Sequence, residues 1–173
     1  MKLVVLPGYS SGNRAWEAEI AKRFESFAWE VVTHQWGHWL GGSFSLEKEM
    51  AKILEEIGDD KVSIIAKSVG TRVAMYLIPK IINKLDKVIF VGIPTKFEST
   101  KVKTLYRDGM LKLGTQNLLC IQNTGDPFSP YITVKNFLQS VNPKIKIIEK
   151  PARNHEYPYY EEFTKFILLD NPR

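Results

Sequence analysis

The chain has 173 residues, 44% of them hydrophobic, which suits one domain over residues 1–173 with a core of its own and leaves too little length for a second. Its 24 Lys and Arg against 19 Asp and Glu give a formal charge of +5, and the basic residues are spread over several segments. The densest of these, 96–112, also holds Glu98 and Asp108, so it indicates a solvated helix face, and no nucleic-acid partner is expected.

Short apolar runs alternate along the chain with longer segments of helical period. The first run, KLVVL, predicts a strand over 2–6, and the segment 13–27 then carries apolar residues at helical spacing after Asn13, a candidate N-cap. The pattern predicts an α/β fold in which helices cover both faces of a mostly parallel sheet. Further strands are predicted near 30–33, 62–66, 87–92, 117–122 and 145–149, and further helices near 45–57, 69–83, 130–139 and 158–169.

Nothing in the sequence indicates a membrane or an oxidising compartment. The chain starts with the strand-like KLVVLPG and has no long apolar segment, so neither a signal peptide nor a membrane span is expected. Cys120 is the only cysteine, so no disulfide can form within the chain, and its neighbours in NLLCIQ indicate a small buried hydrophobe. We therefore expect a cytoplasmic protein.

Turn-forming residues follow several of the predicted strands. The segments concerned are LPGYSSGN, VGIPT, NTGDPFSP and KPARNHEYP. The carboxyl ends of parallel strands share one edge of the sheet, and ligands bind at that edge in open sheets of this kind. Four such turns gathered there favour a functional site at this edge.

A serine stands at the joint between strand and helix in KVSIIAKSVGTRVAMYLI. Ala66-Lys67-Ser68-Val69-Gly70 approximates G-x-S-x-G, in which small residues flank a sharp turn that exposes a nucleophilic serine. Ala66 replaces the first Gly, and Ala is the next smallest residue. An ordinary helix cap is the alternative role of such a serine. Lys67 is expected to be a solvated neighbour.

A serine hydroxyl becomes a good nucleophile when a neighbouring base accepts its proton, and histidine is the usual base. Behind such a turn the triad follows in the order Ser, acid, His, which favours His155, after the last predicted strand. Asp126 is preferred as the acid because it lies in a turn directly after an apolar strand, which Pro127 stops from continuing. Asp108 and Glu149 remain alternatives for the acid.

Taken together, these motifs resemble the α/β-hydrolase superfamily, and more narrowly its small lidless branch that includes retinoblastoma-binding-protein-nine-like serine hydrolases. The resemblance runs from VVLPGYSSG through AKSVG and GDPFSP to NHEYP, nearly the whole chain. It implies a minimal α/β-hydrolase fold, a doubly wound six-stranded sheet with strand order 2-1-3-4-5-6. Asn154 departs from the Gly that many relatives have before the histidine. Larger relatives insert a cap domain at about 96–114, where this chain has room for one short helix, so an open site is expected.

The same resemblance implies two backbone donors for an oxyanion. The N–H of Val69, after the serine, is one donor, and the loop PGYSSGN after the first strand supplies the other through Tyr9 or Ser10. Gly8 permits the close approach of the backbone in that loop. A phosphate-binding loop is the alternative, but PGYSSGN lacks both G-x-G-x-x-G and a P-loop lysine.

The segment THQWGHWLGG after the second strand carries His34 and His38, which are four residues apart like metal ligands on one helix face. Gly37 and two tryptophans argue against a helix there, so no metal is expected. Large aromatic side chains suit the wall of a substrate pocket instead. The residues assigned to this pocket are Gly8, Trp36, His38, Trp39 and Phe128.

The sequence therefore predicts a serine hydrolase that cleaves a carboxylic ester or similar acyl bond of a small molecule. Ser68 is the expected nucleophile, His155 the base, and Asp126 the residue that orients the imidazole. No cofactor is required. A protein-binding module that keeps the hydrolase scaffold without efficient catalysis is the first alternative. A flavodoxin-like nucleotide-binding domain is the second.

Overall fold

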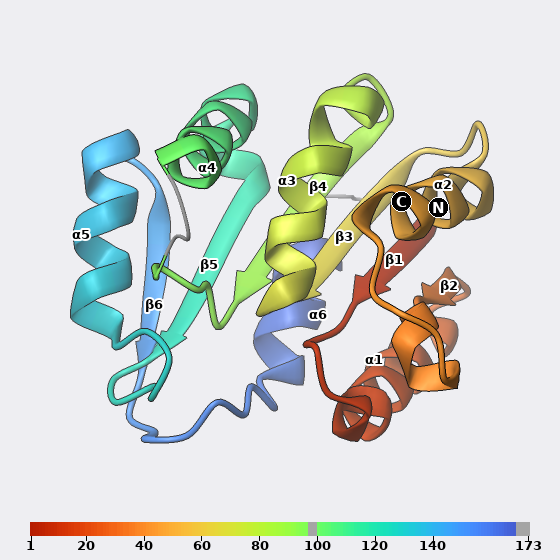
Figure 1. Cartoon of the computed structure of the whole chain (residues 1–173), viewed down its shortest axis with the longest axis horizontal. Coiled ribbons are helices and arrows are strands. Elements are labelled where there is room, and N and C mark those ends of the chain that lie inside the picture. The colour runs from red at the N-terminus through yellow and green to blue at the C-terminus, as the bar shows by residue number, and fades with distance from the viewer. Residues whose placement is uncertain (97–99, 169–173) are drawn as a thin grey trace.

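The computed structural model describes residues 1–96 and 100–168 and consists of a central sheet between two layers of helices (Figure 1). Within these residues six parallel strands follow the order β2-β1-β3-β4-β5-β6, which confirms the predicted fold class and strand order. The strands are β1 (Lys2–Leu6), β2 (Glu30–Thr33), β3 (Val62–Lys67), β4 (Leu85–Val91), β5 (Leu118–Asn123) and β6 (Lys146–Lys150).

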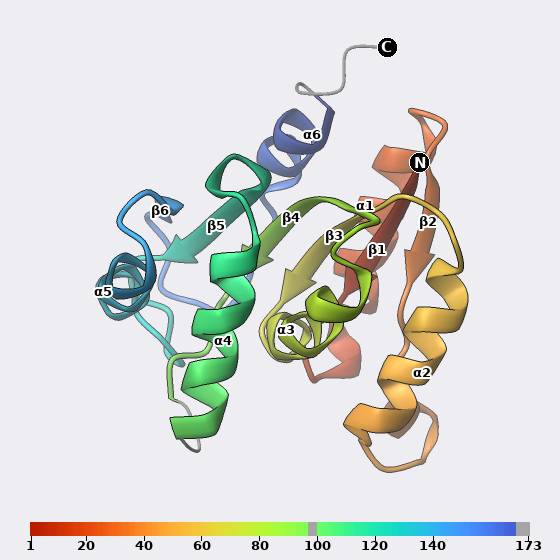
Figure 2. The same cartoon turned by 90° about the horizontal axis from the view of Figure 1, so that it is seen from above.

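The helices divide between the two faces of the sheet, as Figure 2 shows from above. One face is covered by α1 (Arg14–Glu25) and α6 (Tyr160–Leu168). The other is covered by α2 (Leu46–Ile57), α3 (Val69–Ile81), α4 (Thr100–Lys112) and α5 (Tyr131–Val141). The connections within the described residues contain the short 3-10 helices η1 (Ser11–Asn13), η2 (Gly37–Leu40) and η3 (Thr115–Asn117). In the described part of the chain, every helix is too short or too polar to cross a membrane.

Successive side chains of a strand point to opposite faces of the sheet, so each central strand contributes side chains to both hydrophobic cores. In β1, Leu3 and Val5 pack under α1 and α6, whereas Val4 and Leu6 pack on the opposite side, beneath the larger helical layer. Cys120 of β5 is buried in that larger core, and its burial raises the pKa of the thiol. This explains why the central strands read as unbroken apolar runs in the sequence.

Several boundaries differ from the sequence-based expectation by one or two residues, and two features differ in kind. Asn13 occupies the N-cap position of α1, but its side chain donates to the Ser10 carbonyl at 2.7 Å and makes no cap hydrogen bond. The segment 96–114, expected to hold one short helix, contains the 13-residue α4. Glu98 and the last residue of the helix predicted over 158–169 lie outside the described residues.

Glu17 on α1 has a buried carboxyl group. The residue is 3% exposed, and within the described residues its Oε1 has no hydrogen-bond partner. Burial raises the pKa of Glu17 from 4.5 to about 8, against the attraction of nearby Arg14. The folded chain therefore binds this proton more tightly than the unfolded chain, and the free energy of unfolding should fall as pH rises from about 4.5 through about 8.

We predict that Glu17→Gln raises the melting temperature at pH 9 and changes it little at pH 5, because the amide needs no deprotonation at high pH. Thermal denaturation followed by circular dichroism at both pH values measures this difference. Glu25→Gln, an exposed position on the same helix, is the matched control and should show no such pH dependence. Equal shifts of the Glu17→Gln variant at pH 5 and pH 9 would contradict the prediction.

Candidate active site

Ser68 lies on a sharp turn between β3 and α3. Its φ of 53° and ψ of −118° place it in a backbone region that residues other than glycine seldom adopt. The turn is held from both sides. The Ser68 N–H donates to the Val91 carbonyl of β4 at 3.0 Å, and the Ser68 carbonyl accepts from the N–H and hydroxyl of Thr71 at 2.9 and 2.7 Å. A strained residue so firmly fixed is typical of a functional position.

The glycine two residues after the serine is required by close packing. A Cβ at Gly70 would lie 2.2 Å from the carbonyl oxygen of Leu6 and 2.8 Å from that of Pro7. The first turn of α3 therefore presses directly against the end of β1. Ala66, at the first small position of the motif, is completely buried in β3.

The turn after β5 and the loop after β6 bring Asp126 and His155 together. Nδ1 of His155 lies 2.6 Å from Oδ2 of Asp126, while Oδ1 accepts the N–H groups of Phe128 and Ser129 at 2.8 and 3.2 Å. Asp126 is only 1% exposed. A carboxylate at this place selects the imidazole tautomer with hydrogen on Nδ1, which leaves Nε2 free to accept a proton.

Tyr157 is a second donor to the same carboxylate oxygen, which the sequence analysis did not assign. Its hydroxyl donates to Oδ2 of Asp126 at 2.5 Å. Burial by itself would raise the pKa of Asp126, but the hydrogen bonds from His155 and Tyr157 outweigh it and hold that pKa below its usual value. Burial, reinforced by the neighbouring carboxylate, raises the pKa of Tyr157, so the phenol keeps its proton. The carboxylate is therefore ionised at neutral pH.

The imidazole of His155 is enclosed by two aromatic rings and a glycine. Phe128 and Tyr157 meet it edge to face, with ring centroids 4.7 and 5.7 Å away. Gly92, with a φ of 61°, gives it room, since a Cβ there would lie 2.8 Å from Cε1 of His155. Phe128 itself is 60% exposed, so it presents an apolar face to solvent beside the imidazole.

Ser68 and His155 both lie against the end of β4. The backbone of Ser68 is bonded to Val91, and the next residue, Gly92, touches the imidazole. Nε2 of His155 is buried and has no hydrogen-bond partner within the described residues. A hydrogen bond between nucleophile and base often tightens only when substrate binds. The arrangement therefore leaves an unoccupied acceptor at the sheet edge that carries the strained serine.

Lys67, expected to be solvated, is buried. It is 2% exposed, its Nζ donates to Glu156 at 3.2 Å, and it lies 5.7 Å from the ring centre of Trp16. Helix α1 and the loop after β6 cover the end of β3 here, which explains the burial. Burial lowers the pKa of Lys67, against the attraction of Glu156. The ion pair connects the residue before Ser68 with the residue after His155.

Asn154 braces the histidine loop. Its side-chain oxygen accepts the N–H of Glu156 at 3.2 Å, and its carbonyl accepts from the Asn123 side chain at 2.9 Å. The loop that carries His155 is thus tied both to itself and to the end of β5.

The aromatic segment after β2 lies behind the loop that follows β1. Nε1 of Trp36 donates to the Gly8 carbonyl at 3.0 Å, and the Tyr9 carbonyl accepts from Nε1 of Trp39 at 2.7 Å. His38 also bonds this carbonyl at 2.8 Å and stacks on the Tyr9 ring at 4.1 Å. In a trans peptide the N–H points opposite to the carbonyl. These bonds therefore turn the N–H groups of the next two residues, Tyr9 and Ser10, away from the aromatic segment.

Trp36 is completely buried, so the expectation that it forms a pocket wall does not fit its position. Trp39 and His38 are partly exposed. His34 is buried and pairs through Nε2 with Glu49 at 2.8 Å, away from His38. In the part of the chain that the structure describes, no three potential metal ligands gather.

The remaining candidates take the following positions. Val69 is the first residue of α3 and follows Ser68 directly, and the Ser10 hydroxyl accepts the N–H of Gly12 at 3.2 Å as the N-cap of η1. Of the alternative acids, Asp108 is exposed on α4 and Glu149 accepts from the hydroxyl of Thr124 at 3.0 Å. Only Asp126 among the three contacts His155.

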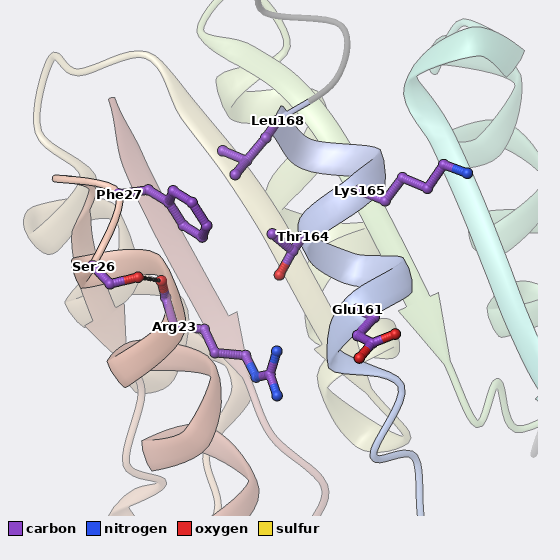
Figure 3. A pocket seen from close by; sticks show the side chains of 7 residues that line it. All are labelled: Arg23, Ser26, Phe27, Glu161, Thr164, Lys165 and Leu168. Carbon is purple, nitrogen blue, oxygen red and sulfur yellow. Dashed lines mark hydrogen bonds between the residues drawn. The ribbon is translucent and has the colours of Figure 1, made fainter.

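Two cavities lie in different parts of the fold. A small one of about 190 Å³ opens at the serine and is lined by Ser68, Val69, Arg72, Pro94, Lys96, Val102 and Tyr106. A larger one of about 470 Å³ lies between α1 and α6, as Figure 3 shows. Its lining residues are Arg23, Ser26, Phe27, Glu161, Thr164, Lys165 and Leu168, none of which was a candidate site residue.

Comparison with known proteins supports the fold. No protein-family model and no curated protein matches the chain. Solved structures do: the ydeN gene product of B. subtilis is 14% identical, with a TM-score of 0.68 over 96% of this chain and 98% of that one. A serine hydrolase without lid from Xanthomonas campestris is 13% identical, with a TM-score of 0.73 over 99% and 83%. Mouse alpha/beta hydrolase domain-containing protein 10 is 12% identical, with a TM-score of 0.65 over 98% and 88%. The chain therefore has the α/β-hydrolase fold, and these likenesses single out no branch among the proteins that share it.

Proposed function

We propose that the protein is a serine hydrolase that cleaves a carboxylic ester or a similar acyl bond of a small molecule through a covalent acyl-enzyme. The observation that carries the proposal is the 2.6 Å hydrogen bond between His155 and Asp126. The imidazole of His155 lies at the same sheet edge as the strained Ser68. The proposal is also supported by the names of two proteins with the same fold, a serine hydrolase without lid and an alpha/beta hydrolase domain-containing protein.

In the first half of the reaction, the Ser68 hydroxyl oxygen attacks the acyl carbon while Nε2 of His155 takes the hydroxyl proton. The oxyanion that forms is stabilised by the N–H of Val69 and by an N–H of Tyr9 or Ser10. When the tetrahedral intermediate collapses, the bond to the leaving group breaks and His155 delivers the proton to it. Water then repeats the sequence on the acyl-enzyme and releases the acid. Asp126 stabilises the imidazolium in both halves.

The proposal includes no cofactor, metal, nucleic acid or membrane. We keep a reducing cytoplasm as the expected compartment, supported by the single buried Cys120, which leaves no disulfide within the chain. A protein-binding module on the same scaffold is the alternative, since fold alone does not imply activity.

Covalent labelling separates the enzyme from the binding module. The purified protein is incubated with a fluorophosphonate and its intact mass is measured, alongside assays on p-nitrophenyl esters of graded acyl length. One adduct of the expected mass together with turnover of short esters supports the proposal. The absence of both would favour the binding module.

Trp36→Phe tests the role of the aromatic segment. The substitution keeps a buried aromatic ring but removes the N–H that donates to the Gly8 carbonyl. The N–H of Tyr9, on the opposite side of the same peptide bond, is then no longer held in one direction. Because an oxyanion donor acts in the transition state, we expect kcat to fall about tenfold with KM nearly unchanged. Trp29→Phe, in the opposite core, is the matched control. A rise in KM at constant kcat would indicate a substrate contact instead.

A further inference from the structure

The cavity at the serine combines a small volume with two cationic side chains. Its volume of about 190 Å³ is below that of pockets for drug-sized ligands, roughly 300–1,000 Å³. Arg72 and Lys96 line it together with Ser68. None of its described lining residues is acidic.

The two cations reach the cavity from different elements. Arg72 lies in the first turn of α3 and lines the cavity together with Ser68, which directly precedes that helix. Lys96 comes from the connection after β4 and is exposed. Arg72 also interacts with another group, but a guanidinium has five N–H donors and can serve two partners.

The rest of the cavity wall is apolar and firmly held. Tyr106 is completely buried and Val102 is 7% exposed. The hydroxyl of Tyr106 is bonded to that of Thr71 at 2.8 Å, and Thr71 in turn holds the Ser68 carbonyl. A substrate group in this cavity would therefore contact both a fixed aromatic ring and positive charge. Arg72 is half-buried and Lys96 is exposed, and hydrogen bonds from either cation to a carboxylate are charge-assisted and therefore strong.

We infer that this cavity holds the acyl part of the substrate and selects a short acyl group that ends in a carboxylate, as in the half-ester of a dicarboxylic acid. The inference rests on the proposed hydrolase function and adds its substrate class. The apolar wall accommodates the few methylene groups, and Arg72 and Lys96 bind the terminal carboxylate.

A pair of substrates with four-carbon acyl groups tests the inference. Monoethyl succinate carries the terminal carboxylate and ethyl butyrate lacks it, and acid release from both is followed by titration at constant pH. We expect the wild-type kcat/KM to favour monoethyl succinate by at least about tenfold, since hydrogen bonds to a charged group are roughly twice as strong as those between neutral groups. The preference should shrink at high salt, because salt screens the exposed Lys96.

Arg72→Gln and Lys96→Gln should each lower the preference for monoethyl succinate about tenfold, mainly through its KM. Lys165→Gln, which removes a cation from the separate cavity in Figure 3, is the matched control and should leave the preference unchanged. If Arg72→Gln does not fold, protection of the wild type from fluorophosphonate labelling by succinate, but not by butyrate, replaces it.

The outcomes distinguish the inference from the proposed function. Hydrolysis of both esters with no preference for the anionic one, or a preference that neither variant changes, would overturn the inference and leave the hydrolase intact. A protein that hydrolyses neither ester and takes no fluorophosphonate label would instead overturn the proposed function.

Discussion

Ser68→Ala is expected to abolish labelling by a fluorophosphonate and to lower kcat on esters by about 10⁶-fold, the loss typical when a nucleophilic serine is removed from a triad. The methyl group cannot form the acyl-enzyme, and water would have to attack the ester directly. Intact-mass spectrometry measures the adduct and stopped assays measure kcat.

The fold of this variant should be unchanged, because the contacts that hold the turn involve the backbone of Ser68 and not its hydroxyl. Circular dichroism checks this point. Ser140→Ala, an exposed serine on α5, is the matched control and should label like the wild type. An equal adduct on Ser68→Ala would assign the reactive group to another residue.

The fold could be predicted largely because its central strands are buried on both faces. Strands such as KLVVL then read as apolar runs that no amphipathic helix would produce, and the helices between them keep their own period. Boundaries were less predictable where charge enters the core. The charged residues Asp86 and Lys87 interrupt the apolar run, yet Leu85 already pairs with Val62 of β3, so β4 begins two residues before its expected start.

The site was predictable only in its chemically distinctive members. A serine in a tight strand-to-helix turn, and an acid and a histidine after later strands, carry local signals. Tyr157 carries no such local signal, because its partner Asp126 lies 31 residues away in the sequence. Lys67 likewise reads as an ordinary surface lysine, since its partner Glu156 is 89 residues distant. Such contacts become visible only once the sheet has brought the loops together.

Asp126→Asn is expected to lower kcat by about 10⁴-fold, as when the acid of a protease triad is replaced. The environment of this residue makes the loss especially direct. The N–H groups of Phe128 and Ser129 both donate to Oδ1, so an asparagine would keep its oxygen there and place its amide nitrogen where Oδ2 now lies. That nitrogen would face Nδ1 of His155 and favour the tautomer with hydrogen on Nε2, which cannot accept the serine proton.

The comparison variants are Asp108→Asn and Glu149→Gln, which remove the two alternative acids by the same carboxylate-to-amide change. Both variants should retain nearly full kcat on the same ester, since neither side chain contacts His155. Fluorophosphonate labelling of Asp126→Asn should be slow but not absent, because Ser68 remains. Tyr157→Phe should fall between these extremes, because it removes one donor from Oδ2 of Asp126 while leaving the bond to the imidazole in place. If either alternative variant loses more kcat than Asp126→Asn, the carboxylate that orients His155 during turnover is not the one bonded to it in this structure.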